Sequence, residues 1–139
     1  MEPIPQQPEA LEHTVTVLLA EDEVLIRLDV AEELRRAGWK VIEVASAHDA
    51  MDILNSSVIV DLVVTDVNMP GEANGLDLAR FVARERPNIK VVIMSGHFIP
   101  AAEPEHAPPC DLFIPKPFLH SQLVDQLLPL LQSGTGPSE

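Results

Sequence analysis

Four segments of this sequence each bring reactive side chains to the end of a short apolar run. Runs 18–20 and 62–65 lead into acids, and runs 91–94 and 112–115 lead into a serine and a lysine. Such runs, separated by amphipathic stretches, are typical of buried parallel strands. Because ligands of open parallel sheets bind beyond the carboxyl ends of the strands, we expect these side chains to converge at one edge. In chain order they are Glu21, Asp22, Asp66, Ser95 and Lys116.

The three acids at this edge favour a divalent cation. In the strand order 2-1-3-4-5 the first and third strands are neighbours, which would place Glu21, Asp22 and Asp66 close together. Two unit charges about 4 Å apart repel by about 4 kcal/mol at an effective dielectric of about 20. Magnesium relieves such repulsion because it is a hard cation that takes oxygen ligands octahedrally and usually keeps waters. We therefore expect Mg²⁺ held by two carboxylates, a backbone carbonyl and waters.

Each of these signals also has a purely structural interpretation. Acids at 21–23 suit the first turn of a helix because of the helix dipole. Asp66 and Ser95 could simply begin turns, and Lys116 could be an ordinary exposed lysine. The placement of all of them at successive strand ends favours a site. Lys116 also lies between two prolines, a setting compatible with a cis Lys116–Pro117 peptide bond.

The pattern of apolar residues predicts the elements that position this site. Strands are expected over 14–20, 39–44, a segment ending at Asp66, 90–94 and 112–114. Ser46 and Asn74 can cap helices 47–54 and 75–86. Two further helices are indicated by helical spacing: one by Val24, Leu28, Ala31 and Leu34 before Gly38, the other by Leu119, Leu123, Leu127 and Leu130. Pro129 is expected to end or kink the last helix.

The order of these elements predicts an α/β fold, a flavodoxin-like, doubly wound, five-stranded parallel sheet in a three-layer α/β/α arrangement. Residues 99–110 hold four prolines where the fourth crossover helix belongs. We expect a degenerate, proline-rich loop there, with a turn or two of helix at most. The domain is predicted over 14–132, after a flexible leader at 1–13 and before a tail at 133–139. We expect no output domain within a tail of that length.

Composition narrows the classes of partner. The 139 residues suit one domain, and 9 basic against 22 acidic residues give a formal charge of −13. Such a surface disfavours direct binding of nucleic acid or anionic membrane, which bind lysine and arginine. One cysteine, Cys110, excludes an intrachain disulfide and fits a reducing compartment. Without a signal-like start or an apolar run of about 20 residues, we expect a cytoplasmic protein with no membrane insertion.

Four stretches, 17–23, 61–70, 91–96 and 113–118, resemble the receiver domain of two-component response regulators, of the single-domain type. The resemblance covers about 14–132. It implies that Asp66 is the phospho-acceptor. It further implies that Asp22 ligates Mg²⁺ directly, that Glu21 is its partner, often through water, and that the backbone carbonyl of Asn68 is a third protein ligand.

The resemblance also assigns roles to residues around the acids. It implies that Ser95 contacts the phosphoryl group, that Lys116 is its charge partner, and that Phe113 is the switch aromatic. Because Phe113 lacks a hydroxyl, any switch must work by packing alone. Asn68 and His97 lie two positions beyond Asp66 and Ser95, and by resemblance tune how fast water removes the phosphoryl group. The purely structural interpretation of His97 is that it is an exposed loop histidine.

The implied function is a phosphoacceptor module that signals by protein contact and promotes only its own phosphorylation and dephosphorylation. The implied partners are a sensor histidine kinase or phosphotransfer protein, a downstream protein target, and a weak homodimer as a further option. A phosphohydrolase using an aspartyl-phosphate would need a second acid at Asn68. A flavodoxin-like FMN protein would need a phosphate cradle where acids 21–23 stand. A phosphate-sink domain cut from a larger hybrid kinase or regulator remains open.

Overall fold

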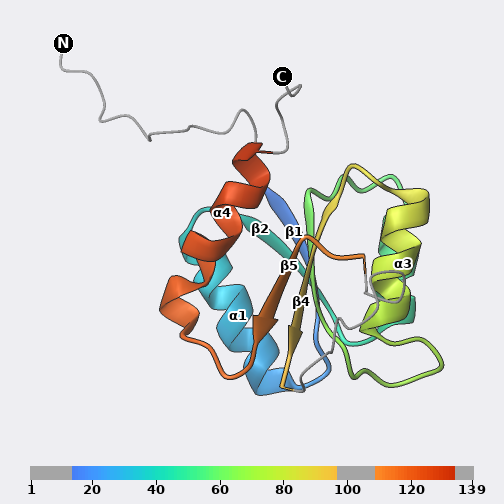
Figure 1. Ribbon diagram of the computed structural model, residues 1–139, viewed down its shortest axis with the longest axis horizontal. Coiled ribbons are helices and arrows are strands. Elements are labelled where there is room, and N and C mark those ends of the chain that lie inside the picture. The colour runs from blue at the N-terminus through green and yellow to red at the C-terminus, as the bar shows by residue number, and fades with distance from the viewer. Residues whose placement is uncertain (1–13, 97–108, 134–139) are drawn as a thin grey trace, which may run out of the picture.

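The computed structural model describes residues 14–96 and 109–133 of the chain. A five-stranded sheet lies at its centre, in the order β2-β1-β3-β4-β5, and every neighbouring pair is parallel (Figure 1). The predicted strand order is confirmed. The strands are β1 Thr16–Ala20, β2 Lys40–Val44, β3 Leu62–Asp66, β4 Lys90–Ser95 and β5 Leu112–Pro115.

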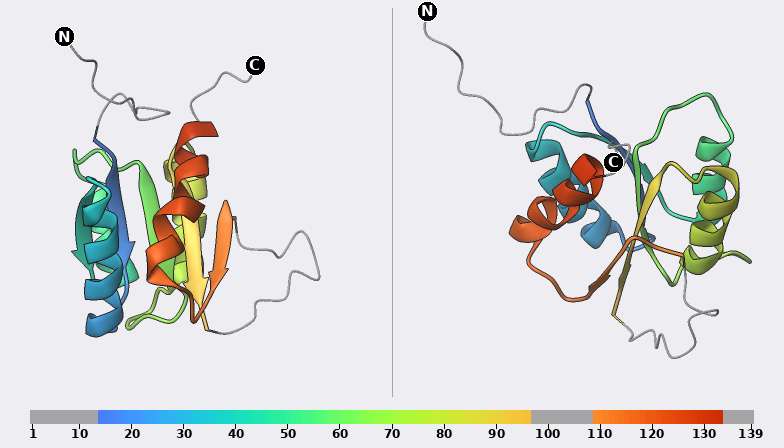
Figure 2. Two further views of the ribbon diagram at one scale, coloured as in Figure 1. Left: turned by 90° about the vertical axis from the view of Figure 1, so that its left-hand side faces the viewer. Right: turned by 45° about the horizontal axis from the view of Figure 1, so that its top comes forward.

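Helices cover both faces of the sheet. The helices are α1 Val24–Arg36, α2 Ala47–Leu54, α3 Gly75–Glu85 and α4 Leu123–Ser133, with a short 3-10 helix η2 at His120–Gln122. Residues of α1 and α4 pack in one core, and residues of α2 and α3 pack in the other (Figure 2). The predicted three-layer, doubly wound architecture is therefore confirmed.

The strands read as continuous apolar runs because both of their faces are covered. Val17 and Leu19 of β1 face the core of α1 and α4, whereas Leu18 and Ala20 face the core of α2 and α3. This is the alternation of a strand, with one apolar set for each face. The strand that ends in Asp66, β3, lies at the middle of the sheet, and all five of its residues are buried.

The predicted helix caps are present. The Ser46 hydroxyl accepts the Asp49 N–H at 3.1 Å and so begins α2. The Asn74 side chain accepts the N–H groups of Leu76 and Asp77, and the Asp77 carboxylate accepts the Asn74 N–H at 2.9 Å. This reciprocal capping box fixes the start of α3, which follows the loop that leaves Asp66.

Two apolar helix faces differ from expectation. In α1, Ala31 and Leu34 are fully buried as predicted, but Val24 and Leu28 are 53% and 49% exposed. The reason is that the packed side of α1 runs through Ile26, Val30, Ala31 and Leu34, so Val24 and Leu28 lie toward the solvent side of the helix. Leu119 is 63% exposed, because it precedes η2 and lies outside the helix whose apolar side it was expected to share.

Pro129 does not end the last helix, which continues through it to Ser133. Proline removes one intrahelical N–H donor. Pro129 is exposed, whereas Leu123 and Leu127 of the same helix are fully buried against the sheet. Burial of leucine side chains at about 1.5–3 kcal/mol each outweighs the loss of one hydrogen bond.

Several expectations fall on residues 1–13, 97–108 and 134–139, which lie outside the described part of the chain. They are the leader, most of the proline-rich segment with its degenerate helix, His97, and nearly all of the tail. Across 14–96 and 109–133, no helix combines the length and the hydropathy that crossing a bilayer requires.

Candidate functional site

The sheet register brings the two acidic segments together. Ala20 at the end of β1 pairs with Thr65 of β3. The next residues, Glu21 and Asp66, therefore leave two adjacent strands at the same level. Asp22 follows directly before α1 begins. The convergence expected for these acids is thus a consequence of parallel pairing between β1 and β3.

Ser95 and Lys116 belong to β4 and to the segment after β5, which lie on the side of β3 away from β1. Asp66 pairs with Met94 of β4, so Ser95 lies one residue beyond that level. Ser95 is 2% exposed. The carbonyl of Ser95 accepts the Lys116 N–H at 2.8 Å, which fixes where the chain leaves β5. The Lys116–Pro117 peptide bond, whose setting is compatible with the cis form, is cis.

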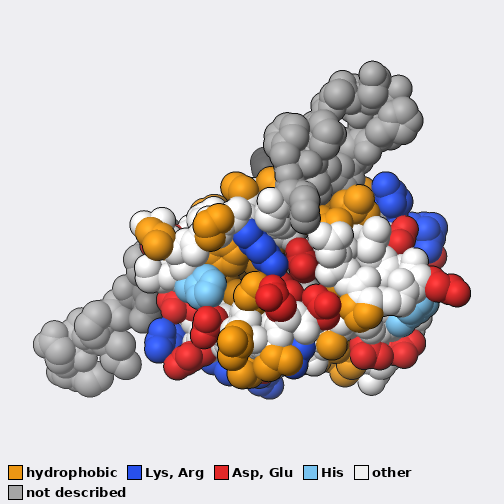
Figure 3. Space-filling view, turned by 90° about the horizontal axis from the view of Figure 1, so that it is seen from below, with side chains coloured by type: hydrophobic (Ala, Val, Ile, Leu, Met, Phe, Trp, Pro, Cys, Tyr) orange, Lys and Arg blue, Asp and Glu red, His pale blue; other side chains and the backbone are white. Residues whose placement is uncertain are grey.

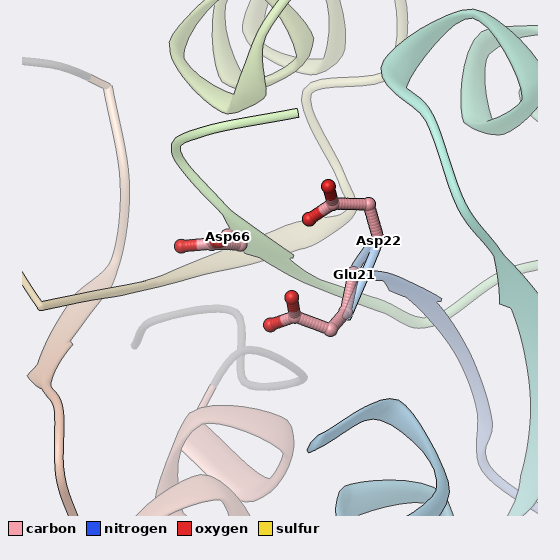
Figure 4. A group of neighbouring side chains, drawn as sticks. All are labelled: Glu21, Asp22 and Asp66. Carbon is pink, nitrogen blue, oxygen red and sulfur yellow. The ribbon is translucent and has the colours of Figure 1, made fainter. Parts of the chain in front are cut away.

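Glu21, Asp22 and Asp66 form a compact carboxylate cluster. Each offers an oxygen within 4.8 Å of the oxygens of the other two. Figure 4 shows Glu21 and Asp22 reaching from the end of β1 on either side of Asp66, with their carboxylates toward the same space. Glu21 is 1% and Asp66 8% exposed, whereas Asp22 is open to solvent. Three hard oxygen donors with one open side suit Mg²⁺, which keeps waters when bound.

Lys116 is the cation that the fold itself brings to these acids. Its Nζ lies 3.0 Å from Oε1 of Glu21 and 3.5 Å from Oδ1 of Asp66, and its side chain is 17% exposed. One lysine thus contacts acids at the ends of two neighbouring strands, β1 and β3. Against three carboxylates it leaves an excess of negative charge.

The ionisation of the cluster reflects burial. Burial raises the pKa of Asp66, although the charge of Lys116 and the Val67 N–H, at 2.8 Å from Oδ1, act in the opposite direction. Burial likewise raises the pKa of Glu21, against hydrogen bonds from Glu23 and Lys116. Burial would lower the pKa of Lys116, but its bond to Glu21 and the two carboxylate charges outweigh it, and the pKa is raised. A further cation would therefore stabilise the ionised acids.

Three further residues were predicted for the site: Phe113, Asn68 and His97. Phe113 pairs with Ile93 of β4 and packs, partly buried, against the core beneath α2 and α3. Asn68 is exposed, two residues beyond Asp66. His97 belongs to the segment that the structure does not describe. Phe113 is therefore seated in the packed layer, and Asn68 stands at the solvent side.

Two residues that support Asp66 were not singled out from the sequence. The Thr65 hydroxyl donates to the Asp66 carbonyl at 2.8 Å, and the Gly75 N–H donates to the Val67 carbonyl at 2.8 Å. A β-carbon at Gly75 would overlap the carbonyl of Asp66. Only glycine therefore allows α3 to begin this close to the strand end. The available signal was a glycine at the first position of a helix, where ordinary side chains are tolerated.

Arg27 of α1 was also missed. Its Nη1 donates to the backbone carbonyl of Glu21 at 2.9 Å, and its Nε lies 3.3 Å from Oε1 of Glu43 on β2. The sequence signal was a single arginine within the apolar stretch that opens α1. Its partner could not be read from the sequence because Glu43 is 16 positions away.

Figure 3 looks onto the carboxyl edge of the sheet. Asp and Glu side chains gather in the middle of this face, with hydrophobic side chains around them. The exposed Val24, Leu25 and Leu28 of α1 follow directly after the acids in the sequence. The face thus combines an acidic centre with apolar surroundings.

The fold and this edge define a flavodoxin-like α/β domain whose strand ends carry a carboxylate cluster and a lysine. A sequence model of the family described as "Response regulator receiver domain" matches residues 17–128. The chain belongs to this family, and it is a phosphoacceptor receiver domain of two-component signalling. The resemblance of its motifs to a receiver domain is confirmed.

Relatives of known name agree with this assignment. The chain is similar to the response regulator receiver protein CpdR of Brucella abortus (strain 2308), with 30% identity over 116 residues, 83% of this chain and 95% of CpdR. Sensor kinase CckA of the same strain shares 37% over 128 residues, 88% of this chain and 13% of CckA. A crystal structure of a response regulator receiver protein from Sinorhizobium medicae WSM419 matches with 33% identity and a TM-score of 0.78, covering 87% and 97% of the two chains.

Several relatives are much longer than this chain. It spans 13% of the length of CckA and 25% of the length of the DNA-binding transcriptional regulator NtrC of Azospirillum brasilense. What is shared with those two proteins is therefore the receiver portion.

Proposed function

We propose that Asp66 is the phospho-acceptor and that it receives its phosphoryl group from a phosphohistidine of a sensor histidine kinase or phosphotransfer protein. The observation that carries this proposal is the position of Asp66. It lies within 4.8 Å of two other carboxylates and 3.5 Å from the lysine Nζ, at the end of the central strand. An aspartate with that set of neighbours has both a nucleophilic oxygen and the means to offset charge around it.

The reaction needs few further protein groups beyond the nucleophile and the positive charges around it. A carboxylate oxygen of Asp66 attacks phosphorus in line, the bond from phosphorus to the histidine nitrogen breaks, and the imidazole leaves. Phosphoryl transfer depends mainly on positioning and on cations near the equatorial oxygens. Lys116 lies where it can offset that charge. Glu21, Asp22, Asp66 and the Asn68 carbonyl would hold Mg²⁺, which supplies further positive charge when bound.

The phosphoryl group would then act on the switch residues. Ser95 ends β4 one level beyond Asp66, and its hydroxyl would turn toward the new phosphoryl oxygens. Phe113, partly buried in the layer beneath, would repack into the space that Ser95 leaves. The signal is a population shift, in which the phosphorylated aspartate favours one of two packings. Asn68, which is exposed, would set how fast water removes the phosphoryl group, and the same role is proposed for His97.

The output is proposed to be contact with another protein rather than catalysis on a separate substrate. The formal charge of −13 disfavours nucleic acid, and Asn68, where a phosphohydrolase would need an acid, cannot act as general acid or base. We place the exchange in the cytoplasm, because the implied phosphodonor acts there. The similarity to the sensor kinase CckA supports a second candidate, a receiver that drains phosphate within a larger relay.

The assignment of Asp66 is tested by labelling with a small phosphodonor in the presence of Mg²⁺, followed by intact-mass measurement and hydroxylamine treatment. The wild-type chain should gain one hydroxylamine-labile phosphoryl group, and Asp66→Asn should gain none. Asp61→Asn, on the residue before the same strand, is the matched control and should label normally. A label retained by Asp66→Asn would place the acceptor elsewhere.

A further inference from the structure

Arg27 contacts the backbone of a proposed metal ligand, whereas Lys116 contacts the carboxylates. Its Nη1 donates at 2.9 Å to the carbonyl oxygen of the peptide bond that joins Glu21 to Asp22. Because a peptide unit is planar, fixing its oxygen fixes the direction in which the next residue leaves. The Arg27 contact therefore bears directly on where the Asp22 side chain can point.

The other polar groups of Glu21 also have partners. Its N–H donates to the carbonyl of Val44 at 3.1 Å, at the end of the edge strand β2. Its carboxylate accepts the Glu23 N–H at 3.0 Å and Lys116 Nζ at 3.0 Å. The bond from Arg27 adds the carbonyl to this set. Backbone and side chain of Glu21 are thus both tied to neighbouring elements.

Arg27 is itself held by β2. Oε1 of Glu43 lies 3.3 Å from Nε of Arg27, and Oε2 of Glu43 lies 2.9 Å from Nη1 of Arg35. The side chains of Arg27 and Glu43 are 19% and 21% exposed, whereas Arg35 is 49% exposed. The guanidinium group is a planar fork, so an acid that holds Nε also sets the direction of Nη1. A lysine at position 27 would carry the same charge, but it could not contact both Glu43 and the Glu21 carbonyl through one planar group.

We propose that Arg27 is a positioning residue for the metal-ligand pair Glu21 and Asp22, and that Glu43 orients it. The inference rests on the proposed Mg²⁺ site. The positive charge of Arg27 is directed at a carbonyl and at Glu43, so its effect on the cation arises through the position of the ligands. Removing a group that orients a metal ligand typically weakens metal binding by about 10- to 100-fold.

The test is Mg²⁺ affinity of the full chain, measured by calorimetric titration and by the NMR shift of the Asp22 amide. Arg27→Met should bind Mg²⁺ about tenfold more weakly than wild type. Arg27→Lys should be nearly as weak, because it keeps the charge and loses the fork. Arg35→Met is the matched control: it removes the same kind of contact with Glu43 but none with Glu21, and should bind within about twofold of wild type. Thermal melts without Mg²⁺ show whether each variant is folded.

Wild-type affinity in Arg27→Met, or an equal loss in Arg35→Met, would overturn the positioning role and leave the metal site intact. Rescue of affinity by Arg27→Lys would also overturn it, because charge alone would then suffice. If Arg27→Met does not fold, Glu43→Gln decides: a several-fold weaker affinity supports the proposal, and unchanged affinity overturns it. A wild-type chain that binds no Mg²⁺ would overturn the metal site together with this inference.

Discussion

Strand β3 has an aspartate at each end, Asp61 just before it and Asp66 as its last residue. At the amino edge, the Asp61 carboxylate accepts the Thr16 N–H of β1 at 2.9 Å. Asp111, just before β5, likewise accepts the Val91 N–H of β4 at 2.8 Å. At the carboxyl edge, the carboxylate of Asp66 instead faces two other acids and a lysine.

The two edges therefore use one residue type in opposite ways. At the amino edge each aspartate accepts a backbone N–H of a neighbouring strand and so completes the hydrogen bonding of that strand. At the carboxyl edge the acids are buried beside one another, and the pKa values of Glu21 and Asp66 are raised by that burial. Without a cation the buried carboxylates lower the stability of the fold, and a bound cation stabilises them. Binding of a ligand can therefore change the state of this edge. The following predictions test this contrast.

The largest effect is expected from the glycine that touches the carboxyl edge. Gly75→Ala places a β-carbon on the Asp66 carbonyl, and we expect a loss of about 3 kcal/mol in the free energy of unfolding, with weakened phospholabelling. Gly38, which precedes β2 at the amino edge, has φ +90 and nothing near its missing β-carbon. Gly38→Ala should cost about 1 kcal/mol, from backbone strain alone, and label normally.

These two variants are compared by urea unfolding and by labelling. Equal losses of stability in both would mean that the close approach of α3 to Asp66 is not what requires glycine at position 75.

Changing the aspartates at the two ends of β3 should move the free energy of unfolding in opposite directions. Asp61→Ala leaves the Thr16 N–H without its acceptor and should lower the free energy of unfolding by about 1–2 kcal/mol. Asp66→Asn removes a buried charge from a crowded cluster and should raise it when Mg²⁺ is absent. Urea unfolding in a chelator measures both. A destabilised Asp66→Asn would contradict the view that the empty cluster is costly.

Asp22 should matter to the metal more than to the fold, because it is exposed and follows β1 rather than lying within it. Asp22→Ala should weaken Mg²⁺ binding about tenfold and remove the Mg²⁺ dependence of labelling at millimolar concentration. Asp29→Ala, an exposed acid of α1, is the control and should titrate like wild type. An unchanged Mg²⁺ titration in Asp22→Ala would exclude a ligand role.

The smallest effect is a pH dependence. The pKa values of Glu21 and Asp66 are raised from 4.5 and 3.8, so the folded chain binds more protons than the unfolded chain just above those values. The contribution of these two groups to stability therefore falls as pH rises from about 4 toward neutrality. Without Mg²⁺, Asp66→Asn should show a flatter pH profile than wild type or Asp61→Asn. Identical profiles for all three would contradict the raised pKa of Asp66.

Much of the fold could be predicted because its signals are local. The apolar runs predicted the strands, and Ser46 and Asn74 marked the starts of α2 and α3, since a capping side chain acts within three residues of itself. The convergence of Glu21, Asp22 and Asp66 followed from placing each at a strand end. Pro129 does not end the last helix, because the propensity of one residue is weaker than the burial of its neighbours on the same helix.

The sequence by itself thus determined the elements, their order and the chemistry at the strand ends, because residue type and spacing are sufficient for these. Packing alone decided which apolar side chains stay exposed, such as Leu119, and which backbone groups Arg27 and Gly75 meet. Those contacts join residues that are far apart along the chain or depend on the exact approach of two elements. Their geometry exists only once the sheet and its helices are assembled.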